Sequence, residues 1–476
     1  MKDEPEESDL SSSILEKKDI GKPAIQDFKL YKIRWPIVLF FSSSMIAGGL
    51  AQIGLSPIMS IIKEIYGKDG IIISLLVLPF TIFFIPLMYP ANYLIEKYGI
   101  TIPIYIACIT LVIGAWIRML VNTSFYFLLA GQCVMAFGQP FVISSPAKVA
   151  GVWFGDKERA LATTLGSLAG PFGAVIGYLL PLPLISDSDT DPKSLGRSRM
   201  SRYILIQSII ITALTLPVLI FIRNRPPTPP SASAANSIKK KSDGLIKNSF
   251  RLLKNLNFLL LMVGFSSVYS IYTTLGAAIG PLTHSFGYNS RDNSLFGSIY
   301  IVGGVFGSFA HAIFLDKYSR YKMQFIIIGI TNCISFALVI FLISQGSVVL
   351  TACLLFIMGF SQLPVIGVAY AFVAEMTYPI DEALSCGMIH LLGSIIATAF
   401  AFMATSFIDN NKTNLALYIL LGLCVLGLFC KFFIKEILKK KRAGIRGTIL
   451  SFHFGNTSFP NSYRNTIRSE KVKAEQ

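Results

Sequence analysis

Apolar runs long enough to cross a bilayer recur about twelve times along this sequence of 476 residues. Within a bilayer the backbone N–H and C=O groups find no water, so a spanning segment must satisfy them internally, as a helix does. The expected spans are 35–62, 71–91, 102–121, 125–147, 160–182 and 203–222, followed by 256–284, 293–315, 323–344, 348–374, 383–408 and 414–435. The sequence therefore predicts an all-α membrane protein with twelve transmembrane helices.

Part of the first half of the chain is repeated in the second. The segments that start at Met135 and Met358 both open on Met-x-Phe-x-Gln, both continue with a Val-Ile pair, and both end on alanine. A second pair of similar segments, Leu94–Tyr98 and Phe314–Tyr318, has nearly the same offset. Repeats of this kind predict two pseudo-symmetric six-helix bundles.

The charge distribution predicts how the chain is divided and oriented. We expect a disordered tail (1–31), a first bundle (32–222), a flexible basic linker (223–254), a second bundle (255–436) and a basic tail (437–476). Six spans per bundle put the linker and both termini on one side, and most lysines and arginines fall there, which favours the cytoplasm. Nothing in the sequence separates the plasma membrane from endolysosomal membranes.

Composition excludes several classes of function. A net charge of +16 would suggest nucleic acid for a soluble chain, but 53% of the residues are hydrophobic. The basic residues flank apolar spans, where they face anionic lipid, so we expect the bilayer as partner and no nucleic acid. The seven cysteines lie within apolar segments without a metal or disulfide spacing. Because no catalytic or nucleotide-binding constellation is present, we predict a non-enzyme without cofactor. We expect the protein to be a monomer.

Three of the glutamines that lie within predicted spans are candidates for substrate binding. Gln139 and Gln362 occupy equivalent positions of the repeat near mid-span, and Gln52 lies in the first span. A polar side chain at this depth needs a partner or water. The glutamines either bond between helices or face one central cavity as substrate-binding groups.

Three further residues complete the candidate substrate site. Tyr269 and Tyr272 lie three residues apart, so they share a helix face and offer hydroxyls and π surfaces to a ligand; ordinary packing is the alternative. His390 lies about two turns into its span and is either a substrate ligand or a satisfied structural histidine.

Charged residues are informative chiefly about coupling and substrate charge. No Asp or Glu occupies the middle of a predicted span, which argues against obligate proton symport. Arg118 and Lys431 lie toward span ends, where long side chains can reach the interface. We therefore expect no mid-membrane cation to neutralise an anion, and predict a neutral or cationic substrate.

Small residues, prolines and charged loops indicate where helices could move relative to one another. Glycines at 166, 170, 173, 303 and 307 permit close helix approach, and prolines at 140, 171 and 364 predict kinks. Charges in four loops on the cytoplasmic side are either topology determinants or gates that pair across the bundles. The candidate gating residues are Glu96, Lys97, Glu158, Arg159, Asp316, Lys317 and Glu375.

The chain resembles the major facilitator superfamily in its six-plus-six plan and in the loops containing Glu96–Gly99 and Asp316–Lys317, which are degenerate copies of the superfamily's acidic-basic motif. A closer resemblance is to the FLVCR-type transporters, related to the feline leukaemia virus subgroup C receptor. The matching residues are Tyr31–Trp35, Pro90–Ala91, Gly114–Trp116, Gly131–Gln132, Gln139, Pro146–Lys148, Trp153–Phe154, Glu158–Ala160 and Glu375–Pro379.

This resemblance implies facilitative transport of a small organic solute, with choline, ethanolamine, a pyridoxine-type vitamin and heme as substrates within the family. Members that handle choline are expected to cage it with a tryptophan, a tyrosine and two glutamines. The chain departs at all four positions, which hold Gln52, Thr273, Pro171 and Ser394. We predict a rocker-switch transporter; the alternative is a receptor or nutrient sensor with the same fold that does not transport.

Overall fold

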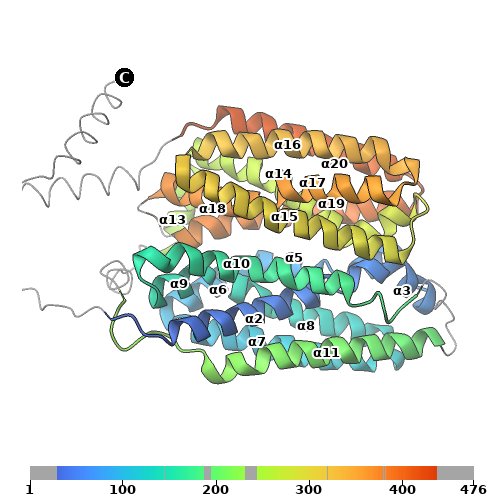
Figure 1. Ribbon diagram of the computed structural model, residues 1–476, viewed down its shortest axis with the longest axis horizontal. Coiled ribbons are helices and arrows are strands. Elements are labelled where there is room, and N and C mark those ends of the chain that lie inside the picture. The colour runs from blue at the N-terminus through green and yellow to red at the C-terminus, as the bar shows by residue number, and fades with distance from the viewer. Residues whose placement is uncertain are drawn as a thin grey trace, which may run out of the picture.

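The computed structural model describes residues 29–143, 145–186, 195–230, 244–318, 320–378, 380 and 382–436, and their regular structure is entirely helical (Figure 1). This confirms the predicted all-α fold. Residues 1–28 of the predicted N-terminal tail, the whole predicted C-terminal tail (437–476) and linker residues 231–243 lie outside the described part of the chain.

Two helical bundles lie side by side in Figure 1, and each contains one half of the chain. The N-terminal bundle comprises α2 (Arg34–Ile53), η1 (Ser56–Ile58), α3 (Met59–Tyr66), α4 (Gly70–Ser74), α5 (Pro79–Ile82), α6 (Phe84–Tyr98), α7 (Thr101–Ile117), η2 (Arg118–Asn122), α8 (Phe125–Ile143), α9 (Pro146–Trp153), α10 (Asp156–Leu179) and α11 (Leu195–Phe221). The C-terminal bundle comprises α14 (Leu256–His284), α15 (Ser290–Tyr318), α16 (Tyr321–Leu342), η3 (Ile343–Gln345), α17 (Val348–Gln362), α18 (Pro364–Thr377), α19 (Glu382–Asp409) and α20 (Thr413–Phe433).

The second predicted span, 71–91, is a broken helix. Within the described residues, 11 helical segments are long and apolar enough to cross a membrane. The remaining predicted span is covered by α4, α5 and α6 in succession. Pro79 begins α5 and has no backbone N–H to donate to the preceding turn. The side chain of Gln132 donates to the carbonyl of Leu76 over 2.7 Å, which satisfies a backbone group in the break.

Glycines bring helices into close contact in both bundles, as the spacing predicts. A methyl group at Gly173 of α10 would overlap the backbone of Ile46 on α2, and one at Gly307 of α15 would overlap the backbone of Phe360 on α17. The proline predictions differ in outcome. Pro364 begins α18 directly after α17, whereas Pro171 lies inside the unbroken α10.

Two basic residues are buried, against the expectation that their side chains reach the interface. Arg118 and Lys431 have no exposed side-chain surface. Arg118 donates to Gln207 over 2.9 Å, and the Nζ of Lys431 lies 4.4 Å from the ring centroid of Phe325. Both turn inward because glycines on neighbouring helices leave room for them, Gly131 beside Arg118 and Gly264 beside Lys431. The predicted position near a span end was right, and the predicted direction was wrong.

The linker also departs from prediction, because it contains a helix. Helix α13 (Leu245–Leu253) buries Leu252 and exposes Phe250. Its Ser249 accepts a hydrogen bond from Tyr89 of α6 over 3.2 Å, which ties this part of the linker to the N-terminal bundle. The amphipathic pattern of the segment explains why it folds.

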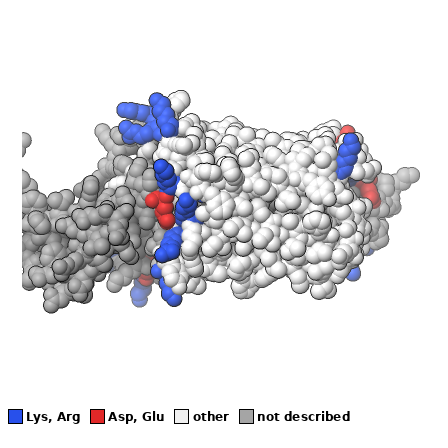
Figure 2. All heavy atoms as spheres, turned by 90° about the horizontal axis from the view of Figure 1, so that it is seen from above, with Lys and Arg blue, Asp and Glu red and all other residues white. Residues whose placement is uncertain are grey.

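Charged side chains lie at the two ends of the molecule, and an uncharged band separates them on the face that Figure 2 shows. The described chain begins and ends at the same end of the bundles (Figure 1). An integral, multi-pass membrane protein has this distribution of charge. We call the end at which the described chain begins and ends the terminal end, and the other the opposite end.

Candidate functional site

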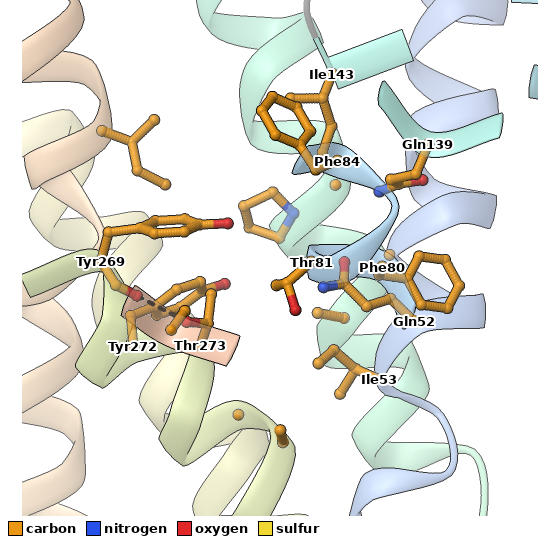
Figure 3. Close-up of a pocket in the computed structure, with 18 of the residues that line it drawn as sticks. Gln52, Ile53, Phe80, Thr81, Phe84, Gln139, Ile143, Tyr269, Tyr272 and Thr273 are labelled. Atoms are coloured by element: carbon orange, nitrogen blue, oxygen red, sulfur yellow. Dashed lines mark hydrogen bonds between the residues drawn. The ribbon is translucent and has the colours of Figure 1, made fainter. Parts of the chain in front are cut away.

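A cavity of about 160 Å³ lies between the two bundles (Figure 3). Its walls come from α2, α5, α6, α8, α9 and α10 of the N-terminal bundle and from α14, α15, α18 and α19 of the C-terminal bundle. This is room for a few waters or for a small solute. A site shared by both bundles changes shape when the bundles move relative to each other.

The wall of this cavity is largely apolar and carries a set of uncharged polar side chains. The polar lining residues are Gln52, Thr81, Gln139, Ser167, Tyr178, Tyr269, Tyr272, Thr273, Tyr370 and His390. Among the described residues that line it there is no Asp, Glu, Lys or Arg. The site can therefore form hydrogen bonds and π contacts, but it offers no opposite formal charge to an ion.

The N-terminal bundle contributes two amide side chains to this wall. Gln52 of α2 and Gln139 of α8 both lie on the N-terminal side of the cavity in Figure 3 and are half-buried. Neither has a hydrogen-bond partner within the described part of the chain. Gln139 fits closely over Gly48, where an added methyl group would lie 2.9 Å from its Oε1. Two amides without protein partners are available to a ligand.

The C-terminal bundle contributes aromatic residues that are arranged around His390. The hydroxyl of Tyr269 lies 3.0 Å from Nε2 of His390, and the hydroxyl of Tyr370 lies 3.0 Å from Nδ1. The imidazole also packs at 4.5 Å, centroid to centroid, on Phe84 of the N-terminal bundle. A hydroxyl can donate or accept, so either imidazole tautomer fits this arrangement. His390 is therefore hydrogen-bonded by two tyrosines and also lines the cavity. The two alternatives from the sequence, a structural histidine and a substrate ligand, do not exclude each other in this arrangement.

Gln362 is the predicted substrate residue that does not line the cavity. It is fully buried inside the C-terminal bundle, where it accepts a hydrogen bond from Tyr300 and donates to Asn332 over 2.5 Å. The ring of Tyr300 stacks on Tyr272 with 5.9 Å between centroids. The other five predicted residues share one cavity, and Gln362 lies behind Tyr272.

Contacts between the bundles close the cavity toward the opposite end. Ser56 and Tyr178 both donate to the carbonyl of Gly276 on α14, over 2.5 and 3.1 Å. Farther out, Lys63 of α3 pairs with Asp409 of α19 over 2.7 Å. These side chains had no distinguishing signal in the sequence, because their partners are more than 90 residues away.

The candidate gating residues lie at the terminal end. Glu158 pairs with Arg34 of its own bundle over 3.0 Å, and Lys97 donates to Tyr93 of its own helix over 2.9 Å. Glu96 and Lys317 are exposed, and Glu375 is half-buried on α18. The side chains of Arg159 and Asp316 lie outside the described part of the structure.

Three of the four positions expected to form a choline cage do line the cavity. Gln52, Pro171 and Thr273 are wall residues, while Ser394 is fully buried on α19. Sequence reasoning missed Thr81, Ser167, Tyr178 and Tyr370 in the wall. Thr81 directly follows the helix break at Pro79, and it accepts a hydrogen bond from Thr398 of the other bundle over 3.2 Å. A proline within a predicted span is the signal that could have indicated Thr81.

Comparison with known proteins agrees with this architecture. The family model described as Major Facilitator Superfamily matches residues 37–383. The chain is 25% identical to the choline/ethanolamine transporter flvcr2a of Danio rerio, over 88% of this chain and 90% of that protein. It is also 25% identical to choline/ethanolamine transporter FLVCR2 of Homo sapiens, over 89% and 81%.

Two further similarities extend the comparison. Solute carrier family 49 member A3 of Xenopus tropicalis is 26% identical over 87% of this chain and 89% of that protein. The crystal structure of a bacterial homologue of the human lysosomal transporter Spinster, inward-facing and unoccupied, aligns with a TM-score of 0.59 and 14% identity over 87% of this chain and 99% of that one. That structural likeness supports the fold.

Proposed function

Because the chain belongs to the major facilitator superfamily, we propose that it is a secondary transporter that carries a small organic solute by alternating access of its central cavity. The observation that carries this proposal is the location of the cavity, whose wall is built from both bundles. Rocking one bundle against the other would expose such a site to each side of the membrane in turn.

The cavity wall favours a neutral or cationic solute with hydrogen-bonding groups. The faces of Tyr269 and Tyr272 can attract a cation, and the free amides of Gln52 and Gln139 can bond a hydroxyl or amine. The relatives named choline/ethanolamine transporters make amino alcohols the first class to test. Since Gln52 replaces the expected cage tryptophan, we propose this class without assigning choline itself.

Uptake into liposomes that contain the purified full chain tests this proposal. We expect saturable accumulation of a solute from a panel of choline, ethanolamine and pyridoxine, with lactate as a small anionic control and heme, which has two carboxylates, as a large one. Accumulation of lactate alone would contradict the proposed substrate class. Binding of a panel solute without accumulation would favour the receptor alternative.

Transport should not require a proton gradient. The wall of the cavity has no carboxylate among its described residues, and both ring nitrogens of His390 are engaged by tyrosine hydroxyls. We expect the initial uptake rate to change less than about two-fold when a protonophore collapses an imposed pH gradient. Valinomycin with balanced potassium serves as the control for membrane potential. Uptake that stops with the gradient would mean that a proton is co-transported.

We also propose that both termini are cytoplasmic and that Lys63 and Asp409 form part of an outer gate. The pair joins the bundles at the opposite end and is partly exposed. The predicted gating charges at the terminal end would then act in the outward-facing form, when the bundles close on that side.

Removing the Lys63 charge should open the outer side more often. Exposed ion pairs contribute about 0.2–1 kcal/mol, so Lys63→Met should raise external access by up to about five-fold. The measurement is the labelling rate of a cysteine introduced at Ala277, a wall residue, by a membrane-impermeant maleimide in a cysteine-free background. Lys68→Met, which removes a charge that lies over Tyr126 of the same bundle, is the matched control. Equal labelling rates in the two variants would show that Lys63 is not part of the outer gate.

A further inference from the structure

Two cysteine side chains meet inside the C-terminal bundle, outside the substrate cavity. The sulfur atoms of Cys333 on α16 and Cys424 on α20 lie 2.9 Å apart, and both residues are free thiols. Cys424 is buried, and Cys333 is half-buried at the surface of the bundle. The two cysteines are 91 positions apart in the sequence, which explains why no motif indicated this pair.

A buried lysine lies next to these thiols. Lys431 is two helical turns after Cys424, so both side chains project from the same face of α20. On α16, a methyl group at Gly329 would lie 3.1 Å from the Nζ of Lys431, and Gly329 is one turn before Cys333. Nζ has no hydrogen-bond partner within the described residues. The ammonium group therefore lies in the contact between α16 and α20, where its charge favours a thiolate.

We propose that Cys333 and Cys424 are a redox-active pair that a peroxide oxidises to a disulfide between α16 and α20. The Cys333 thiol first ionises, and the thiolate attacks one peroxide oxygen and breaks the O–O bond, forming a sulfenic acid. The proton that the thiol released goes to the leaving oxygen, which departs as water or an alcohol. The thiol of Cys424 then attacks the sulfenic sulfur, and a disulfide and one water form. A small side-chain movement brings the sulfurs to the bond length of about 2.05 Å.

Hydrogen bonds connect this thiol pair to the wall of the cavity. Asn332 donates to the sulfur of Cys424 over 3.1 Å and accepts from Gln362 over 2.5 Å. Gln362 accepts from Tyr300, whose ring stacks on Tyr272. Oxidation changes the sulfur that Asn332 contacts, so we infer that the disulfide slows transport. This consequence rests on the proposed function, whereas formation of the disulfide does not.

The disulfide is tested directly by peptide mass spectrometry. The full chain in liposomes is treated with hydrogen peroxide, blocked with a maleimide and digested. We expect a cross-linked peptide that contains Cys333 and Cys424 and that disappears on treatment with dithiothreitol. The Cys333→Ser variant should not form it. The Cys353→Ser variant should still form it, because Cys353 is an exposed thiol on another helix. Oxidation of Cys353 or Cys430 without this cross-link would overturn the proposal.

The role of the lysine and the effect on transport have separate readouts. Lys431→Met should slow formation of the cross-link several-fold relative to Lys435→Met, which removes an exposed charge nearby; equal rates would exclude Lys431 from the reaction.

Peroxide should lower solute uptake about two-fold or more in the unmodified chain but not in Cys333→Ser. A cross-link with unchanged uptake would refute the coupling to the cavity. Absence of uptake by the reduced chain for every solute would contradict the proposed function alone.

Discussion

Replacing Tyr269 with alanine should lower the initial rate of solute uptake by about 30-fold or more. The ring of Tyr269 forms part of the cavity wall, and its hydroxyl holds Nε2 of His390 at 3.0 Å. A desolvated cation–π contact contributes about 2 kcal/mol, which corresponds to about 30-fold. Alanine also leaves a buried imidazole nitrogen unpaired, which adds to the loss.

The conservative variant separates the ring of Tyr269 from its hydroxyl. Tyr269→Phe keeps the π surface and its stack on Phe265, at 5.4 Å between centroids, and loses the hydrogen bond to His390. Because one such bond contributes about 1 kcal/mol, we expect a loss of about five-fold for phenylalanine. Rates are normalised to the amount of folded protein in the liposomes.

Tyr418→Ala is the matched control, since Tyr418 is an exposed tyrosine on α20 that does not line the cavity. It should transport at nearly the unmodified rate. If Tyr269→Ala matched this control, the cavity would not be the transport site. If Tyr269→Phe lost as much as alanine, the hydroxyl and not the π surface would carry recognition.

Much of the fold could be predicted from the sequence, because the bilayer imposes a length and a composition on each span. The repeat also placed Gln139 and Gln362 at equivalent positions of the two bundles, at the ends of helices α8 and α17. It did not predict which way each side chain points. Gln139 faces the cavity, whereas Gln362 turns toward Tyr300 and Asn332 of its own bundle. The two bundles share a backbone plan and differ in the polar groups they bury.

The direction of a side chain depends on neighbours that are distant in the sequence. Arg118 is buried because Gly131 on α8 makes room and Gln207 on α11 accepts its hydrogen bond. A hydropathy pattern gives the depth of a residue and contains no such information. The same limit applies to Lys63 and Asp409, which are 346 residues apart.

Glycine spacing shows this limit most clearly, because two glycines of one predicted motif have different environments. A methyl group at Gly173 would overlap backbone atoms of Ile46 on α2, whereas one at Gly170 would make ordinary contacts with Met45, 3.5 Å from its flexible end and 3.9 Å from its carbonyl oxygen. A clash with backbone cannot be relieved by a change of rotamer, so α10 must move away from α2. From the spacing of small residues alone, Gly170 and Gly173 could not be distinguished.

Gly173→Ala should therefore destabilise the protein by about 1–3 kcal/mol or more, the cost of overpacking a tight contact. Gly170→Ala should be neutral or slightly stabilising, because alanine has the higher helix propensity and the site has room. The measurement is the apparent melting temperature of the two variants in one detergent, read from the loss of monodisperse protein after heating. A lower melting temperature for Gly173→Ala alone would show that contact between the α2 and α10 backbones holds the N-terminal bundle together. Equal stability of the two variants would mean that α2 and α10 are farther apart than in the structure. The part of the cavity wall that these two helices form would then be incorrect.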